Sequence, residues 1–96
     1  KITCRINNQL HLNDYEMWPK ELPILPQKGD LIRSGIGHKH GDNYTYLELE
    51  ICNITIAWDD RYGGWYPELE LNFPSKRYEN ITDFHEWYEK ITKQET

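Results

Sequence analysis

The chain has 96 residues, carries a net charge of −5 at neutral pH, and is 38% hydrophobic and 14% aromatic. This length suits one domain around one hydrophobic core, and the aromatic content is too high for an intrinsically disordered chain. No apolar run approaches the roughly 18 residues that a membrane-spanning helix needs, and the negative charge disfavours binding to a phosphate backbone. We therefore expect a single domain over residues 1–96, with neither a membrane nor a nucleic acid as its partner.

Two cysteines, Cys4 and Cys52, are too few for the disulfide framework of a small secreted domain. Each has isoleucine two residues away, so both side chains are expected to point into the core, either as two thiols or as one bridge. A cytoplasmic location is favoured. Secretion stays open, because the chain begins at Lys1 directly in a strand pattern and an upstream segment could have been removed.

Residues 1–12 alternate between apolar and polar side chains, which predicts a half-buried strand, with a possible hairpin break at Asn7-Asn8. Residues 13–26 are irregular because three prolines interrupt them, and their apolar residues suggest a connection packed over one end of the core. A Pro-x-x-Gly-Asp turn at 26–30 then leads into a strand over 30–36. The glycine-rich residues 34–43 are expected to form a long hairpin loop.

The strongest pattern runs from Tyr44 to Phe73 and predicts two long strands joined by a short loop. The apolar phase changes from odd to even positions at Ile51-Cys52, and such a change inside one strand requires a β-bulge or a bend. An antiparallel register keeps every apolar pair in phase. Its pairs are Trp58 with Trp65, Ile56 with Pro67, Ile54 with Leu69 and Cys52 with Leu71.

After this strand pair, apolar residues recur at helical spacing, which predicts a C-terminal amphipathic helix over about 80–93 with Asn80 as its N-cap. The predicted class is therefore mainly β with one helix. We expect a small, partly open antiparallel barrel of about five strands that the helix closes. With the bend at Ile51-Cys52 and the turn before Leu31, residues 26–74 resemble an SH3-like small barrel in architecture.

Acidic residues concentrate in the central strands. Residues 42–72 hold seven acids and one base, a charge of −6, whereas the rest of the chain is +1. Four glutamates and three tyrosines share the polar side of these strands: Glu48, Glu50, Glu68, Glu70, Tyr44, Tyr46 and Tyr66. The glutamates can pair with Lys1, Arg5 and Arg33 of neighbouring strands, or form a docking face for a basic partner.

The loop between the two strands is rich in aromatic and acidic residues. It contains Trp58, Asp59, Asp60, Tyr62, Trp65 and Tyr66. The favoured interpretation buries both tryptophans at the end of the core and exposes Tyr62 alone. The alternative is a carbohydrate or peptide groove, in which aromatic faces stack on the ligand and the aspartates bind hydroxyls.

A third feature is the spacing of His38, His40 and Asp42, which places three possible metal ligands on one side of an extended segment. A solvated loop is the simpler interpretation, because no fourth ligand is fixed nearby.

No nucleophile elbow, phosphate loop or dinucleotide motif occurs, so we expect no enzymatic activity and no cofactor. The favoured hypothesis is a small acidic interaction module that binds a protein through the acidic, tyrosine-rich face or the aromatic 58–66 loop. The alternatives are a carbohydrate-binding module and a metal-dependent protein. The oligomeric state is left open.

Overall fold

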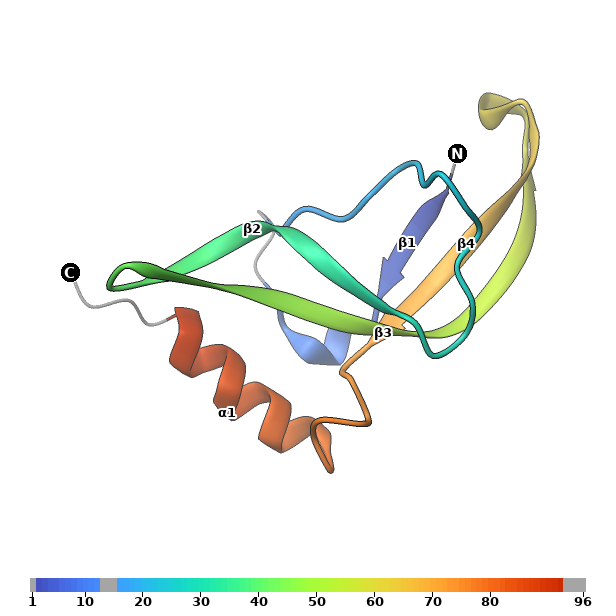
Figure 1. Cartoon of the computed structure of the whole chain (residues 1–96). Coiled ribbons are helices and arrows are strands. Elements are labelled where there is room, and N and C mark those ends of the chain that lie inside the picture. The colour runs from blue at the N-terminus through green and yellow to red at the C-terminus, as the bar shows by residue number, and fades with distance from the viewer. Residues whose placement is uncertain (1, 13–15, 93–96) are drawn as a thin grey trace.

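Four β-strands form one mixed sheet in the order β1-β4-β3-β2 (Figure 1). This computed structural model describes residues 2–12 and 16–92. Its elements are β1 (Thr3–Ile6), η1 (Asn8–Leu10, a 3-10 turn), β2 (Leu31–His40), β3 (Asn43–Asp59), η2 (Asp60–Tyr62, a second 3-10 turn), β4 (Gly64–Asn72) and the helix α1 (Ile81–Thr92). Strand β3 is antiparallel to both neighbours, whereas β1 runs parallel to β4. The mainly β class with one C-terminal helix is confirmed.

Among residues 2–12 and 16–92 the sheet has four strands, is mixed and does not close into a barrel, so the prediction of a partly open antiparallel barrel of about five strands is not confirmed. The expected hairpin within residues 1–12 is absent because Asn7 ends the first strand. Its N–H donates to the carbonyl of Leu71 (3.0 Å), and its side chain caps η1 by accepting from the N–H of Gln9 (3.0 Å). The chain therefore leaves the sheet after β1. The SH3-like resemblance of residues 26–74 stays a prediction.

The irregular segment after β1 connects the two edge strands of the sheet. The N–H of Gly35 in β2 donates to the carbonyl of Met17 (2.8 Å), and the N–H of Ile2, next to β1, donates to the carbonyl of Lys20 (2.8 Å). Trp18 packs against the core in between. The expected packed connection is thus present, although its later part is not core, since Ile24 and Leu25 are largely exposed.

Strand β2 extends through the region predicted to be a long loop, and this prediction is wrong. Pairing continues to His40 opposite Asn43, so only Gly41 and Asp42 form the turn. The glycines do not signal a loop here. They allow an irregular register between Arg33 and Gly37 and the close approach of aromatic rings, because a Cβ at Gly37 would lie 3.0 Å from ring atoms of Tyr44 and Tyr46.

The predicted bulge in β3 is confirmed, because the pairing with β4 shifts between Ile51 and Asn53. The pairs Trp58–Trp65, Ile56–Pro67 and Ile54–Leu69 are also confirmed. The pair of Cys52 with Leu71 is wrong, since Ile51 takes that place and Cys52 is the extra residue of the bulge. Its thiol contacts the carbonyl of Glu70 (3.2 Å).

Helix α1 lies along the β2–β3 end of the sheet (Figure 1). Its buried residues are Phe84, Tyr88 and Ile91, and the rings of Phe84 and Tyr88 stack with centroids 6.1 Å apart. The side chain of Asn80 accepts from the N–H of Asp83 (3.0 Å), which confirms the predicted N-cap. The helix covers the part of the core that β2 and β3 form before and at the bulge.

The bulge can be tested by removing its extra residue. Deleting Cys52 would turn the apolar residues on one side of the bulge toward solvent, so we expect a loss of stability above about 4 kcal/mol or loss of cooperative unfolding in urea. The matched control is Cys52→Ala, which keeps the chain length. Because Cys52 is half-exposed, the control should unfold within about 1 kcal/mol of the parent. Equal stability of both variants would contradict the assigned role of the bulge.

Candidate functional site

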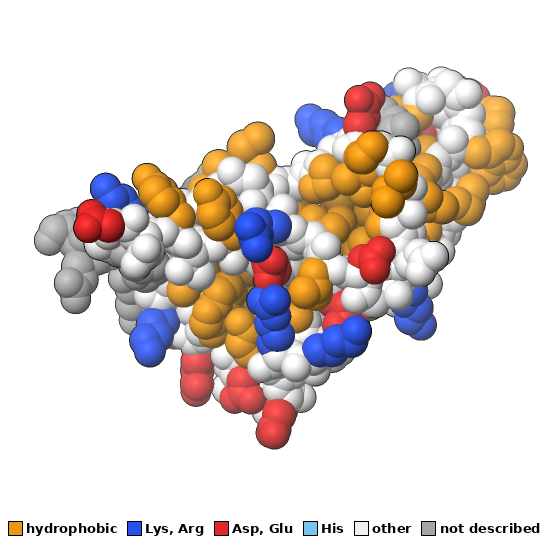
Figure 2. Space-filling model, in the orientation of Figure 1, with side chains coloured by type: hydrophobic (Ala, Val, Ile, Leu, Met, Phe, Trp, Pro, Cys, Tyr) orange, Lys and Arg blue, Asp and Glu red, His pale blue; other side chains and the backbone are white. Residues whose placement is uncertain are grey.

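Beyond Ile54 and Leu69, β3 and β4 continue as a two-stranded ribbon that extends away from α1 (Figure 1). Ile56 is 56% exposed, Trp58 56% and Trp65 71%. We call these three residues the distal patch. Figure 2 shows hydrophobic side chains gathered at this end of the molecule.

The predicted burial of both tryptophans is therefore wrong. By alternation they continue the row of Ile54 and the core residue Leu69, but α1 lies against the other end of the sheet and does not cover the ribbon. The molecule is correspondingly long, with extents of 46 × 26 × 21 Å.

Backbone direction explains the close contact between the two tryptophans. The carbonyl of Leu71 accepts from Asn7 and so faces β1, and by alternation the main-chain groups of Trp65 and Pro67 also face away from β3. Pro67, which has no N–H, loses no bond to β3 there. Trp58 and Trp65 thus form a non-hydrogen-bonded pair, in which side chains approach most closely. Their ring centroids are 5.3 Å apart at 74°, an edge-to-face contact.

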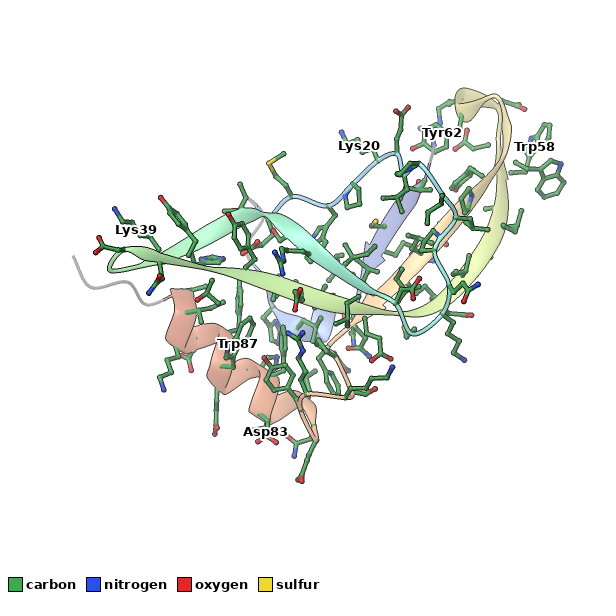
Figure 3. The ribbon with its side chains drawn as sticks, in the orientation of Figure 1. Lys20, Lys39, Trp58, Tyr62, Asp83 and Trp87 are labelled. Carbon is green, nitrogen blue, oxygen red and sulfur yellow. The ribbon has the colours of Figure 1, made fainter. Side chains whose placement is uncertain are left out.

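The two tyrosines of the loop form a separate pair. Tyr66 follows Trp65 directly in β4, so it points to the opposite face of the ribbon. Tyr62 contacts it with ring centroids 5.0 Å apart at 88°. Figure 3 shows Trp58 on the outer side of the ribbon and Tyr62 on the side of Lys20. The four aromatic residues of the loop are therefore not one platform but two pairs on opposite faces.

The turn that joins the strands is held by its aspartates. The carboxylate of Asp59 accepts from the backbone N–H of Arg61 (2.9 Å) and from its guanidinium (2.8 Å at Nη2), and these bonds lower the pKa of Asp59. Asp60 accepts from the indole N–H of Trp58 (3.0 Å). Gly63 completes the turn with a φ of 81°, a conformation that favours glycine. The turn thus fixes one tryptophan of the distal patch.

Two glutamates of the predicted acidic face form ion pairs across strands. Glu68 pairs with Arg5 (3.2 Å), and Glu48 pairs with Arg33 (3.2 Å) and also with Arg77, which sequence reasoning missed. Lys1, the other expected partner, lies outside the described residues. Cross-strand pairing is therefore confirmed for Arg5 and Arg33, and much of the local acidity is neutralised.

The remaining predicted residues of this face are spread along the sheet. Glu50 accepts from the backbone and hydroxyl of Ser75 (3.1 and 3.0 Å), and Glu70 lies opposite Arg5 in the register. Tyr44 and Tyr46 are exposed near the β2–β3 turn, with the guanidinium of Arg33 over the ring of Tyr46 (5.4 Å). A binding role for this face stays a prediction.

Two of the three residues proposed as metal ligands, His38 and Asp42, are not brought together. His38 is 4% exposed and its Nε2 lies 2.7 Å from a carboxylate oxygen of Glu16, whereas Asp42 is exposed in the β2–β3 turn. The side chain of His40 lies outside the described part of the structure. Among the residues that are described, no group of three or more His, Cys, Asp or Glu side chains is placed to hold a metal ion.

A buried polar cluster that sequence reasoning missed surrounds Glu16. Its carboxylate accepts from the hydroxyls of Ser34 (2.6 Å) and Tyr88 (3.2 Å), with His38 as third partner, and its side chain is only 1% exposed. The serine bonds to the carboxylate rather than to the histidine, so the group lacks the serine-to-histidine bond of a catalytic triad. A cluster of this kind fixes packing, since it joins the irregular segment to β2 and α1. No local motif in the sequence could reveal partners 18 and 72 positions away.

Both cysteines are free, so the alternative of a bridge between Cys4 and Cys52 is wrong. Cys4 packs against the core as expected, but Cys52 lies in the bulge and does not. Burial is the main cause that raises the pKa of each thiol, which keeps both mainly protonated at neutral pH.

An apolar hollow lies between the irregular segment and β2, with a volume of about 480 Å³. Its lining includes Met17, Trp18, Leu22 and Leu31. It lies apart from the distal patch.

Comparison with known proteins gives no relative: no protein-family model, curated protein or solved structure matches this chain. In the described part of the chain, α1 is too short and too polar to cross a membrane.

Removing the carboxylate of Glu16 should be strongly destabilising. Glu16→Ala would leave the buried hydroxyl of Ser34 and the ring of His38 without this acceptor, so we expect a loss of about 3–5 kcal/mol in urea unfolding. The control is Glu21→Ala in the same segment, where the side chain is exposed and the change should stay within about 0.5 kcal/mol. A small effect at Glu16 would show that the cluster does not hold the segment.

The turn predicts a pH effect. Because Arg61 lowers the pKa of Asp59, Arg61→Gln should raise that pKa toward its ordinary value, which an NMR titration of the Asp59 carboxyl measures. The stabilisation from this pair is present at neutral pH and should be lost as the pH falls through the lowered pKa. Arg33→Gln is the control and should leave Asp59 unchanged. An identical titration in the parent and Arg61→Gln would exclude the pair in solution.

Proposed function

We propose that this domain is a non-enzymatic interaction module that binds a protein partner through the distal patch. The observation that carries this proposal is the exposure of Trp58 and Trp65 at 56% and 71% on a ribbon that extends away from the core. A large apolar side chain that stays exposed does not contribute the free energy that its burial would give. Clusters of such side chains on a surface are typical of interaction sites.

Tryptophan favours a protein partner, because it is among the residues that contribute most to protein–protein interfaces when it enters a pocket. Trp58 is already oriented, since its indole N–H is bonded to Asp60, so little side-chain entropy would be lost on binding. Asp60 lies directly beside the patch, and its carboxylate accepts from the neutral indole of Trp58, whereas Asp59 is paired with Arg61. The expected partner therefore presents an apolar pocket with a basic rim.

The distal patch is a better candidate than the acidic face of the sheet. On that face Glu48 and Glu68 already have arginine partners within the chain, so a basic partner would have to compete with them. On the distal patch, the apolar area is exposed and binding would bury it.

A carbohydrate ligand is the second candidate, and the same tryptophan exposure favours it. Sugar rings stack on flat aromatic faces, and carboxylates nearby can accept from hydroxyls. Trp58 and Trp65 meet edge to face at 74°, so their two rings do not form one flat surface on which a sugar could stack. Tyr62 and Tyr66 lie on the other face of the ribbon and cannot extend it. We therefore rank a protein partner first.

Affinity capture from the source organism, followed by binding measurements with the purified captured protein, tests the proposal. Trp65→Ala should weaken binding at least about 30-fold, because a central tryptophan contributes about 2 kcal/mol or more. The matched control is Tyr44→Ala, which removes an aromatic side chain that is 58% exposed at the opposite end of the sheet. This control should bind like the parent, and binding should weaken at high salt.

The outcomes separate the two candidates. Equal binding by Trp65→Ala and the parent would exclude the distal patch as the protein site. Quenching or a blue shift of tryptophan fluorescence by oligosaccharides, lost in Trp65→Ala, would favour the carbohydrate alternative instead.

A further inference from the structure

The outer edge of β3 has no strand beside it along the ribbon. Strand β2 pairs with β3 only up to Glu50, and the backbone of Gly29 and Asp30 bonds to Ile51. From Asn53 to Asp59, β3 pairs with β4 alone, and among the described residues no backbone hydrogen bond reaches its other side. Because main-chain groups alternate, Ile54, Ile56 and Trp58 direct their N–H and C=O groups to this open edge.

This edge lacks the features that usually prevent strands from pairing between molecules. Residues 53–58 read NITIAW, with no charge and no proline. Open edges normally carry lysine, proline or a bulge, because unpaired backbone groups next to apolar side chains recruit another strand. The other two edges of the sheet are partly occupied, since the segment from Met17 to Lys20 bonds to β2 and to Ile2 beside β1.

We propose that two copies of this chain associate through antiparallel pairing of their β3 edges over residues 53–59, which makes one continuous sheet. The occupant is a second copy because the edge is complementary to itself about Ile56. In this register all three edge-facing residues are used: Ile56 lies opposite Ile56 of the second copy, and Ile54 lies opposite its Trp58. Each such pair exchanges two backbone hydrogen bonds.

Side chains agree with this register on both faces. On the core side, Ile54 and Ile56 meet Trp58 and Ile56 of the second copy, so exposed apolar area is buried. On the opposite side, Thr55 meets Ala57, which places no charge in the contact. Pairs of aromatic and β-branched residues across strands are among the favourable ones.

Electrostatics permits the association of two acidic chains. In the paired sheet, the carboxylates of the two Glu68 residues would be separated by three strand spacings, about 14 Å or more, which exceeds the Debye length of about 8 Å at physiological salt. Asp59, at the end of the contact, is already paired with Arg61.

Ile56 provides a sharp test because it would lie opposite itself. Sedimentation equilibrium of the parent at several hundred micromolar should give twice the 11.6 kDa chain mass, with dissociation on dilution, since an edge contact of this length belongs to the small interfaces. Ile56→Lys and Ile56→Glu should each be monomeric, because like charges would face each other. An equimolar mixture of the two variants should regain the dimer mass.

The matched control is Ile24→Lys, which places the same charge on a 77% exposed isoleucine in the irregular segment, outside residues 53–59, and should dimerise like the parent. A monomeric parent at all concentrations, a dimeric Ile56→Lys, or a mixture that stays monomeric would each overturn the proposal. Circular dichroism checks that the variants are folded. The measurement uses the purified chain alone, so it does not depend on the partner proposed above. Trp65→Ala, which lies on β4, should still dimerise.

Discussion

The buried carboxylate of Glu16 is the interaction on which the arrangement of this domain depends. It joins three separate parts of the chain: the irregular segment, β2 through Ser34 and His38, and α1 through Tyr88. A carboxylate removed from water is tolerated only where several donors surround it. The geometry of its partners therefore has little freedom, and the segment from Met17 to Lys20 is held in place to bond both sheet edges.

The molecule has two halves that differ in how much apolar surface they bury. Around the bulge, β3 and β4 are covered by α1 and by Trp18, and the core residues Leu49 and Leu69 are fully buried. Past Ile54 the same two strands carry the exposed side chains of Ile56, Trp58 and Trp65, and an isolated two-stranded ribbon is only marginally stable in water. The Trp58–Trp65 contact, the bonds of Asp59 to Arg61 and the left-handed Gly63 supply local support there.

Sequence periodicity predicted the parts of the fold that depend on local alternation. The phase change at Ile51-Cys52 required a bulge, the spacing of Phe84 and Tyr88 required a helix, and the register of Trp58 with Trp65 followed from keeping apolar residues in phase. Alternation gives the face of a strand but not what covers that face. For this reason the exposure of both tryptophans could not be predicted, because it depends on where α1 ends in space.

The candidate site was harder to predict than the fold for a related reason. Gly35 and Gly37 resemble loop residues in composition, yet they serve a strand whose buried His38 contacts Glu16, 22 positions earlier in the chain. Contacts over such separations leave no local pattern. Arg77, in the connection before α1, likewise pairs with Glu48. The net charge of the acidic face could therefore not be predicted from the residues of the strands alone.

The parallel pairing of β1 with β4 has a consequence for how the chain reaches this fold. Thr3–Ile6 pairs with residues 68–71, so this strand can enter the sheet only after those later residues have been synthesised. Contacts between such distant residues slow folding, because closing the long loop between them costs entropy before any contact can offset it. During synthesis β1 therefore stays without its partner strand until residues 68–71 have emerged.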